Sequence, residues 1–430
     1  MTTKEKFETF LNNIKVDNAE QISTRYSEIT KKLNKVFRGS DSETSNCLRV
    51  GSYGRYTGIK GISDLDMLYI MPDSLWSTYE DDPKKLLKDT RDALKERYPK
   101  TDITYDTLVV VVNFKNFKFE VQPVFEIELE DGKIGYKYPN TKNGGSYKLT
   151  KPRHEQDAMT EFRAKYGDTH RRLCKMMRSW TNNVGLQMGG LLLDTLAYNF
   201  LKDDEDLAQT TLSSFDSLCM SFFRFLKDEP KKDHYQALGS GQDVKVKHKF
   251  QSKAKTAYNN ASDAIDAQEE EDKHECWRKI FGKNFPDVES TENSTNKSCS
   301  EREQYIEDLY PIRISGSLKI NCRISANGFQ DRFLRDILGN RGFVSKMKTL
   351  NFFIESTDIE SPDIIKWKVR NVGYEAERRN CIRGQIIVSN SSDRKGRRES
   401  SDFHGPHFVE CYLIKDGYVV ARDRIDVPIE

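Results

Sequence analysis

Asp64 and Asp66, which are separated by a single residue, directly precede a short apolar run at residues 67–71. This pattern predicts a β-strand, in which residues i and i+2 face the same side, so the two carboxylates point together. Adjacent carboxylates repel each other unless a cation lies between them. Oxygen-only ligands suit Mg²⁺, which shares its coordination shell with substrate phosphates. The pair therefore predicts a Mg²⁺ site at the start of a strand.

A glycine-rich loop precedes this pair and opens with Gly51-Ser52. Glycine lets the backbone approach a phosphate closely, and N–H groups together with the Ser52 hydroxyl can cradle it. The loop lacks the lysine and the spacing of the G-x-x-x-x-G-K-[ST] phosphate-binding loop. A lone D-x-D pair is most often a surface turn, but the upstream Gly-Ser and the following apolar strand favour a functional site.

A third carboxylate is expected from a neighbouring strand. Residues 108–125 predict a hairpin with a turn at Lys115-Asn116. Alternation in its second strand puts Phe117, Phe119 and Val121 on one face and Lys118, Glu120 and Gln122 on the other. Glu120 is therefore the acid expected to lean toward Asp64 and Asp66. The alternative is an exposed strand glutamate without a catalytic role.

These residues together resemble the signature of the polymerase-beta-like nucleotidyltransferases. Within that group the chain resembles most the bacterial cGAS/DncV-like nucleotidyltransferases (CD-NTases, the SMODS family) of CBASS antiphage systems. The matching segments are Gly51–Thr57 with Ser63–Asp66, Phe119–Val124 and Gly189–Tyr198. The usual third acid of the family is aspartate, and Glu120 is longer by one methylene.

The resemblance implies an enzyme in which Asp64, Asp66 and Glu120 bind two divalent ions, Mg²⁺ or Mn²⁺. A ribose hydroxyl would attack the α-phosphate of a nucleoside triphosphate, ATP and/or GTP, and pyrophosphate would leave. Repetition would close a cyclic di- or oligonucleotide, which would activate a downstream effector protein. Relatives place a basic residue on the helix expected over residues 169–183, so Lys175 and Arg178 join Gly51 and Ser52 as nucleotide-binding candidates. The alternative for this helix is a solvated basic face.

Two other functions remain open. One is a nucleotidyltransferase that makes a single transfer to a protein, an RNA or a small molecule. The other is a catalytically silent nucleotide sensor. The resemblance of the core and of the C-terminal module argues against the first, and the presence of all three carboxylates argues against the second.

Composition sets limits on the class of protein. Lys and Arg number 69 and Asp and Glu 67, for a formal net charge of +2, which argues against a general nucleic-acid coat protein. No apolar run approaches the length that a membrane span needs, and the N-terminus has no signal-peptide core. The eight cysteines are scattered and form no C-x-x-C pair. We expect a soluble cytoplasmic protein.

The expected fold is α+β: a polymerase-beta-like nucleotidyltransferase core with a helical lobe, plus a C-terminal mainly-β sensor domain. The core would span residues 1–290, with N-terminal helices at 3–37, a catalytic sheet at about 45–130, a helix at 86–98, a long connection at 131–152 and a helical lobe at about 155–287. In that lobe, apolar spacing predicts helices at 169–183, 191–201, 212–226 and within 250–285. Asp194 lies among apolar neighbours and is expected to be a buried, hydrogen-bonded acid.

A polar linker is expected at residues 291–309, and residues 310–430 change to short alternating strands separated by turns such as Asp416-Gly417, which predicts a β-sandwich. This part resembles the adenylyl/guanylyl and SMODS C-terminal sensor domain. The matching residues include Trp367–Asn371, Gly405–His407 and Val409–Tyr412. The resemblance implies a ligand-sensing module.

The ligand expected for this module is an anionic nucleotide, because arginine forks suit phosphates. The arginines concerned are Arg370, Arg378, Arg379, Arg383, Arg397 and Arg398. A solvated β surface is the alternative. A metal site built from His404, His407, Glu410 and Cys411 is disfavoured, since Glu410 and Cys411 would face opposite sides of a strand.

Overall fold

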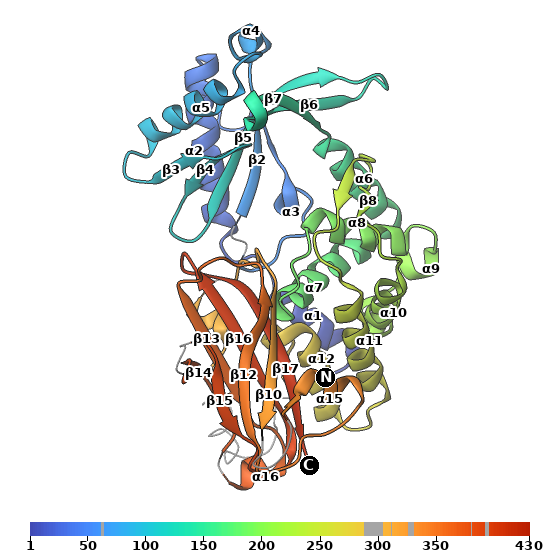
Figure 1. The fold of residues 1–430 in the computed structure, drawn as a ribbon. Helices are drawn as coiled ribbons and strands as arrows, with labels where there is room; N and C mark the ends of the chain where they lie inside the picture. The colour runs from blue at the N-terminus through green and yellow to red at the C-terminus, as the bar shows by residue number, and fades with distance from the viewer. Residues whose placement is uncertain (62–63, 288–303, 311, 326–330, 380, 392–394) are drawn as a thin grey trace. The chain divides into compact units, whose positions relative to one another are not determined.

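The computed structural model describes residues 1–61, 64–287, 304–310, 312–325, 331–379, 381–391 and 395–430 (Figure 1). The chain forms two compact units, residues 1–179 with 188–266 and residues 180–187 with 267–430. Most of the expected linker, up to residue 303, lies outside the described residues. Its last part holds a short helix, α14 (Ile306–Leu309). The predicted domain limits at 290 and 310 stay a prediction.

The first unit is built on a seven-stranded sheet. Its main path runs in the order β1 (Cys47–Arg49), β2 (Asp64–Ile70), β5 (Lys118–Glu128), β4 (Val110–Asn113) and β3 (Asp102–Tyr105). Strands β2 and β5 are parallel, and the other neighbours are antiparallel. The predicted hairpin is confirmed as β4 and β5, and it brings the second half of the site beside β2.

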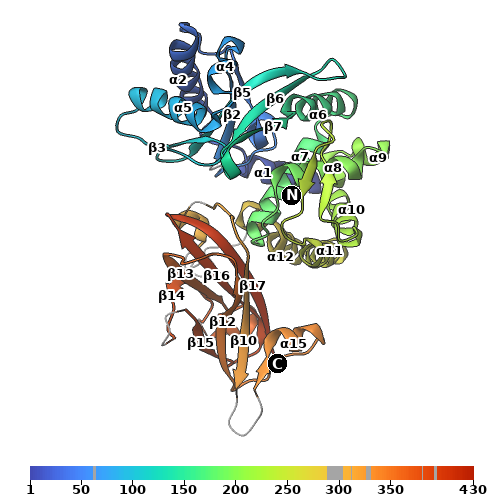
Figure 2. The same cartoon turned by 45° about the horizontal axis from the view of Figure 1, so that its top comes forward.

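Two helices cover one face of this sheet, α2 (Ala19–Arg38) and α5 (Pro83–Arg97) (Figures 1 and 2). Leu65 and Met67 of β2 are buried against them. Because side chains alternate along a strand, Asp64 and Asp66 point to the other face. The core packing thus decides which side of the sheet carries the carboxylates.

Local signals explain where these helices begin and end. Asp82 accepts a hydrogen bond from the backbone N–H of Lys85 at the start of α5, and Pro83 occupies its first turn. Gly39 ends α2 in the left-handed conformation. The helix before α2 is α1 (Thr3–Asn13), so the predicted helices at 3–37 and 86–98 are confirmed.

The expectation of a long connection at 131–152 is wrong. These residues form a second hairpin, β6 (Ile134–Asn140) and β7 (Ser146–Thr150), which continues the sheet from β5. Some of the glycines and asparagines that suggested a loop lie in its turns, where Asn143, Gly144 and Gly145 have positive φ, but Gly135 and Asn140 lie in β6 itself. Residue types that favour turns were therefore mistaken for evidence of a loop throughout the segment.

Helices make up most of the rest of the first unit: α6 (Pro152–Tyr166), α7 (Thr169–Asn183, whose end belongs to the second unit), α8 (Gly190–Leu201), α9 (Glu205–Ala208), α10 (Phe215–Asp228) and α11 (Gln251–Asp266). The predicted helix at 212–226 begins with a 3₁₀ turn, Leu212–Ser214, before α10. A short hairpin that we did not predict, β8 (His234–Gln236) and β9 (Asp243–Lys245), lies between α10 and α11.

The second unit contains two four-stranded sheets, β11-β10-β12-β15 and β14-β13-β16-β17. The strands are β10 (Leu318–Ser325), β11 (Arg332–Phe333), β12 (Thr349–Thr357), β13 (Ile364–Arg370), β14 (Arg383–Val388), β15 (Arg397–Ser400), β16 (Gly405–Lys415) and β17 (Tyr418–Ile429). Ile320 from one sheet and Trp367 and Cys411 from the other share one buried core. The predicted β-sandwich is confirmed (Figure 2). Helices α12 (Glu270–Phe281), α15 (Leu334–Gly339) and α16 (Tyr374–Arg378) complete this unit.

Candidate active site

The parallel pairing of β2 and β5 brings the predicted acids together. Asp66 is the register partner of Glu120, and Asp64 is the partner of Lys118. Neighbouring strands lie about 4.8 Å apart, so the side chains of such partners on one face are neighbours. The structure therefore places Glu120 where alternation predicted it, beside the aspartate pair.

The carboxylates lie close enough to perturb one another. Burial raises the pKa of Asp66 to about 7, and the charges of Glu120 and Asp64 contribute to this increase. A carboxylate with its pKa raised in this way is stabilised by a nearby cation. In the structure, Lys118 supplies a positive charge from the same face of β5.

Lys118 lies in the candidate site, and the sequence analysis assigned it no part there. Its Nζ lies 3.5 Å from Oδ1 of Asp64 and forms an ion pair with Glu120. The available signal was its spacing, since Lys118 stands two residues before Glu120 and shares its face. With this lysine between the acids, the described residues contain no group of three His, Cys, Asp or Glu side chains gathered to hold a metal ion.

The Gly51-Ser52 turn is packed directly against Asp66. Gly51 has φ +63°, and a Cβ atom at this position would lie 1.8 Å from Oδ2 of Asp66. The N–H of Val50 donates to the carbonyl oxygen of Asp66 at 3.0 Å, and a short helix, α3 (Gly51–Gly54), follows. Only glycine fits this position, which joins the predicted phosphate-binding turn to the predicted metal site.

Charged side chains around the buried Asp194 hold the end of the Gly51–Thr57 turn in place. Asp194 of α8 is fully buried, and its carboxylate accepts from Nε of Arg55 at 2.9 Å and from the Thr57 hydroxyl at 3.1 Å. Arg178 of α7 donates to the same carboxylate at 2.6 Å. Burial alone would raise the pKa of Asp194, but Arg178 and Arg55 outweigh it and hold the pKa below its ordinary value. The prediction that Asp194 is a buried, hydrogen-bonded acid is confirmed.

Family comparisons agree with this geometry. Residues 1–162 match the model of the Second Messenger Oligonucleotide or Dinucleotide Synthetase (SMODS) domain. Residues 300–430 match the model of the adenylyl/guanylyl and SMODS C-terminal sensor domain. The chain carries the SMODS synthetase domain of the CD-NTases, together with the SMODS C-terminal sensor domain. It is therefore a nucleotidyltransferase, and its family makes cyclic di- or oligonucleotide second messengers from nucleoside triphosphates.

Individual relatives are distant. A protein of Bacillus cereus (strain VD146) named a probable cyclic nucleotide synthase is 20% identical over 302 residues, which cover 61% of this chain and 88% of the relative. The structure of CdnC from E. coli MS115-1 with ATP has a TM-score of 0.50 at 15% identity, and covers 66% of this chain and 98% of CdnC. The CdnC:HORMA-deltaN complex gives a TM-score of 0.51 at 14% identity, with the same coverage. These likenesses confirm the CD-NTase fold.

The two predicted basic residues of this CD-NTase have different surroundings. Arg178 donates to the Asp194 carboxylate at 2.6 Å and to the Thr57 hydroxyl at 2.9 Å. Lys175, one helical turn earlier, has no hydrogen bond or ion pair within the described residues. Burial lowers the pKa of Lys175, and the neighbouring charge of Arg171 lowers it further. An anion bound here would find Lys175 without a competing partner.

The predicted arginines of the sensor domain are largely engaged with acids of the same domain. Arg378 and Arg379 pair with Glu375, and Glu399 binds Arg383 and Arg397. The role of these arginines in nucleotide binding stays a prediction.

The disfavoured metal site of the sensor domain would include His407, but both ring nitrogens of His407 have hydrogen-bond partners. One ring nitrogen of His407 accepts from the Val372 N–H at 3.1 Å, and the other lies 3.1 Å from the Phe403 carbonyl oxygen. Glu410 binds charged side chains on one face of its sheet, whereas Cys411 is buried in the core of the sandwich.

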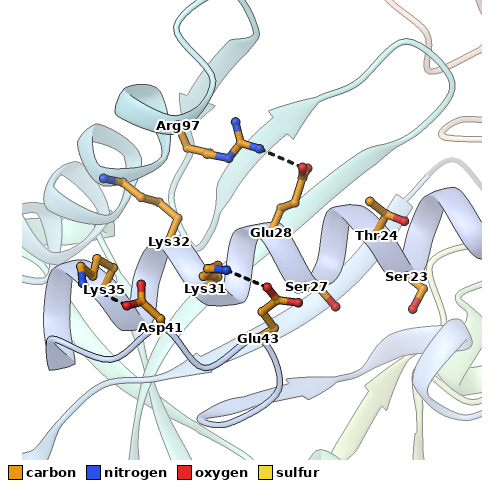
Figure 3. Close-up of a pocket in the computed structure, with 10 residues that line it drawn as sticks. All are labelled: Ser23, Thr24, Ser27, Glu28, Lys31, Lys32, Lys35, Asp41, Glu43 and Arg97. Atoms are coloured by element: carbon orange, nitrogen blue, oxygen red, sulfur yellow. Dashed lines mark hydrogen bonds and ion pairs between the residues drawn. The ribbon is translucent and has the colours of Figure 1, made fainter.

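A surface hollow along α2 holds none of the predicted site residues (Figure 3). Most of its charges are paired with one another, Lys31 with Glu43, Lys35 with Asp41, and Arg97 with Glu28. Among the helices of the described residues, none is long and apolar enough to cross a membrane.

Proposed function

We propose that Asp64, Asp66 and Glu120 are the catalytic acids of this CD-NTase, and that they hold the divalent metal, Mg²⁺ or Mn²⁺, on which the family depends. The parallel register that sets Asp66 beside Glu120 carries this proposal. The donor set suits the metal, because all three side chains offer carboxylate oxygens. Burial, together with the charges of Glu120 and Asp64, already raises the pKa of Asp66. A metal ion would compete with Lys118 for the same oxygens.

Two bound ions would supply stabilisation of charge on the attacking and leaving oxygens of an in-line displacement. The chain itself positions the substrate. Backbone N–H groups of the Gly51-Ser52 turn and the Ser52 hydroxyl donate to the triphosphate, and Lys175 neutralises its charge. Arg178 is the second candidate for this contact, and it would have to share its guanidinium with Asp194.

The reaction that follows forms a bond between a ribose hydroxyl oxygen and the α-phosphorus of a nucleoside triphosphate, and it breaks the bond to pyrophosphate. A second transfer within the linear product closes the ring. No protein nucleophile is needed, so rate acceleration comes from positioning and charge neutralisation.

We propose ATP and/or GTP as substrates, a cytoplasmic role in CBASS antiphage defence, and a downstream effector that the cyclic product activates. The structure of E. coli CdnC with ATP supports the substrate proposal by its similarity of fold. The sensor domain, which follows the synthetase domain in this chain, would bind a nucleotide that regulates synthesis.

Product analysis tests this function. Purified protein is incubated with the four nucleoside triphosphates and Mg²⁺ or Mn²⁺, and phosphatase-resistant products are identified by mass spectrometry. We expect a cyclic product from the wild type and from Asp73→Asn, a matched change at an exposed acid, but none from Asp64→Asn or Asp66→Asn.

Three other outcomes would count against the proposal. A fully active Asp66→Asn protein would remove Asp66 from the site. Linear or acceptor-linked products alone would favour the single-transfer enzyme. Nucleotide binding without pyrophosphate release in either metal would favour the silent sensor.

A further inference from the structure

Tyr56 is the least expected residue of the Gly51–Thr57 turn. It has φ +61°, a left-handed conformation that is unfavourable for a bulky side chain, and its side chain is 66% exposed. Strained residues of this kind persist only where the surrounding structure holds them, and they cluster at functional sites. The strain and the exposure together call for a physical explanation.

The turn is held on both sides of Tyr56. The side chains of Arg55 and Thr57 both bind the buried Asp194. The N–H groups of Thr57 and Gly58 donate to the carbonyl oxygen of Ser52 at 2.9 and 3.1 Å. Tyr56 is thereby held in the turn between Arg55 and Thr57, directly before the residues that bond to Ser52, the residue proposed to bind the triphosphate.

A cation lies over the Tyr56 ring. Cζ of Arg171, on α7, is 4.8 Å from the ring centroid. Nε of Arg171 is buried and has no hydrogen-bond partner within the described residues. Burial and the charge of Arg163 lower the pKa of Arg171. The guanidinium thus supports one region of the ring, while most of the side chain remains open to solvent.

We propose that Tyr56, supported by Arg171, is a stacking platform for the base of a nucleotide whose phosphates are bound at Gly51-Ser52. This inference rests on the proposed function of the turn. An aromatic ring stacks on any nucleobase because every base has a π-face. A ring held rigidly beside a triphosphate site binds the base without losing conformational freedom, which explains why the turn keeps a strained tyrosine.

The test separates the ring from the backbone conformation. Tyr56→Asn removes the ring, and asparagine tolerates the left-handed conformation better than most residues. Tyr56→Phe keeps the ring and removes the hydroxyl. Tyr374→Asn is the control, because it removes an exposed tyrosine from the sensor domain. Dissociation constants are measured by calorimetry for non-hydrolysable ATP and GTP analogues and, separately, for inorganic tripolyphosphate.

We expect Tyr56→Asn to weaken binding of at least one nucleotide analogue about 5- to 100-fold, the range for loss of one base–aromatic stack, with unchanged binding of tripolyphosphate. Tyr56→Phe and Tyr374→Asn should bind the analogues like the wild type. The same loss for analogue and tripolyphosphate would mean that Tyr56 only shapes the turn, and no loss for either would mean that no base stacks there. Either result overturns the inference. Failure of the catalytic assignment would appear separately, as turnover by Asp64→Asn.

Discussion

Gly51 and Asp66 occupy adjoining space, so that a Cβ atom added at Gly51 would lie 1.8 Å from Oδ2 of Asp66. One residue of the proposed phosphate turn therefore determines where a proposed metal ligand can lie. The positive φ of Gly51 adds a second reason for glycine at this position.

Gly51→Ala should reduce the rate of cyclic-product formation by roughly 100-fold or more, because even a displacement of about 1 Å at a catalytic group has a cost of this size. Gly39→Ala is the matched control. Gly39 has φ +64°, but a Cβ atom there would meet nothing within 4 Å. Gly51→Ala should lose more stability than Gly39→Ala, because only its Cβ overlaps Asp66, and only Gly51→Ala should lose activity. Equal activity of the two would show that Asp66 tolerates displacement.

Lys118→Gln should lower the Mg²⁺ concentration needed for half-maximal activity several-fold. The lysine forms ion pairs with Asp64 and Glu120, so its charge repels a cation from the same oxygens. The measurement is a Mg²⁺ titration of pyrophosphate release at saturating nucleotide. Lys115→Gln, in the turn before β5, provides the control. A higher Mg²⁺ requirement in Lys118→Gln would mean that the lysine assists the acids.

Asp194→Ala should destabilise the protein by roughly 3–5 kcal/mol, because it removes the fully buried carboxylate that pairs with both Arg55 and Arg178. Denaturant titration followed by circular dichroism measures this change. Asp228→Ala breaks an exposed ion pair with Lys227 and should change stability by no more than about 0.5 kcal/mol. Similar values for the two would show that the buried cluster contributes no more than a surface pair.

Glu410 should make the sensor domain sensitive to acid. Burial raises the pKa of Glu410, but Lys368 and Arg422 outweigh it and lower the pKa to about 2. A lowered folded-state pKa stabilises the fold above the unfolded value of about 4.5, and this contribution is lost as the pH falls toward 2.

Glu410→Gln should therefore lower the melting temperature most above pH 5, and the difference from wild type should shrink between pH 4.5 and 2. The exposed Glu375 has a pKa of about 2, lowered first by its hydrogen bond with Arg378, and serves as the comparison. Glu375→Gln should have little effect, because exposed ion pairs contribute little. A constant difference between Glu410→Gln and wild type across this pH range would argue against the charge as the cause.

Local patterns were sufficient to place the three acids. The i, i+2 spacing of Asp64 and Asp66 predicted their common face, and alternation along 117–122 predicted that of Glu120. The parallel register that brings these faces together was not predicted and is seen in the structure. The catalytic roles of these acids remain to be measured.

Other features could not be predicted from sequence patterns, because they depend on contacts between residues that are far apart in the sequence. The pairing of Arg55 with Asp194 has no local signature, and Arg178 was considered only as a phosphate ligand. Lys118 was placed on the same face as Glu120, as the structure shows. Its ion pair with Asp64 could not be predicted, because it depends on the register between β2 and β5. The β6–β7 hairpin was mistaken for a loop because glycine, proline and asparagine, which are typical of loops, occur both in its turn and in β6.

The ion cluster around Asp194 also sets an order of events during synthesis of the chain. Arg55 and its partner Asp194 are 139 positions apart. A nascent chain that ends after the three acids lacks α7 and α8. It therefore lacks Arg178 and Asp194, whose side chains hold the turn that begins at Gly51. An incomplete translation product would therefore carry all three proposed metal ligands but lack the Asp194 carboxylate that binds Arg55 and Thr57.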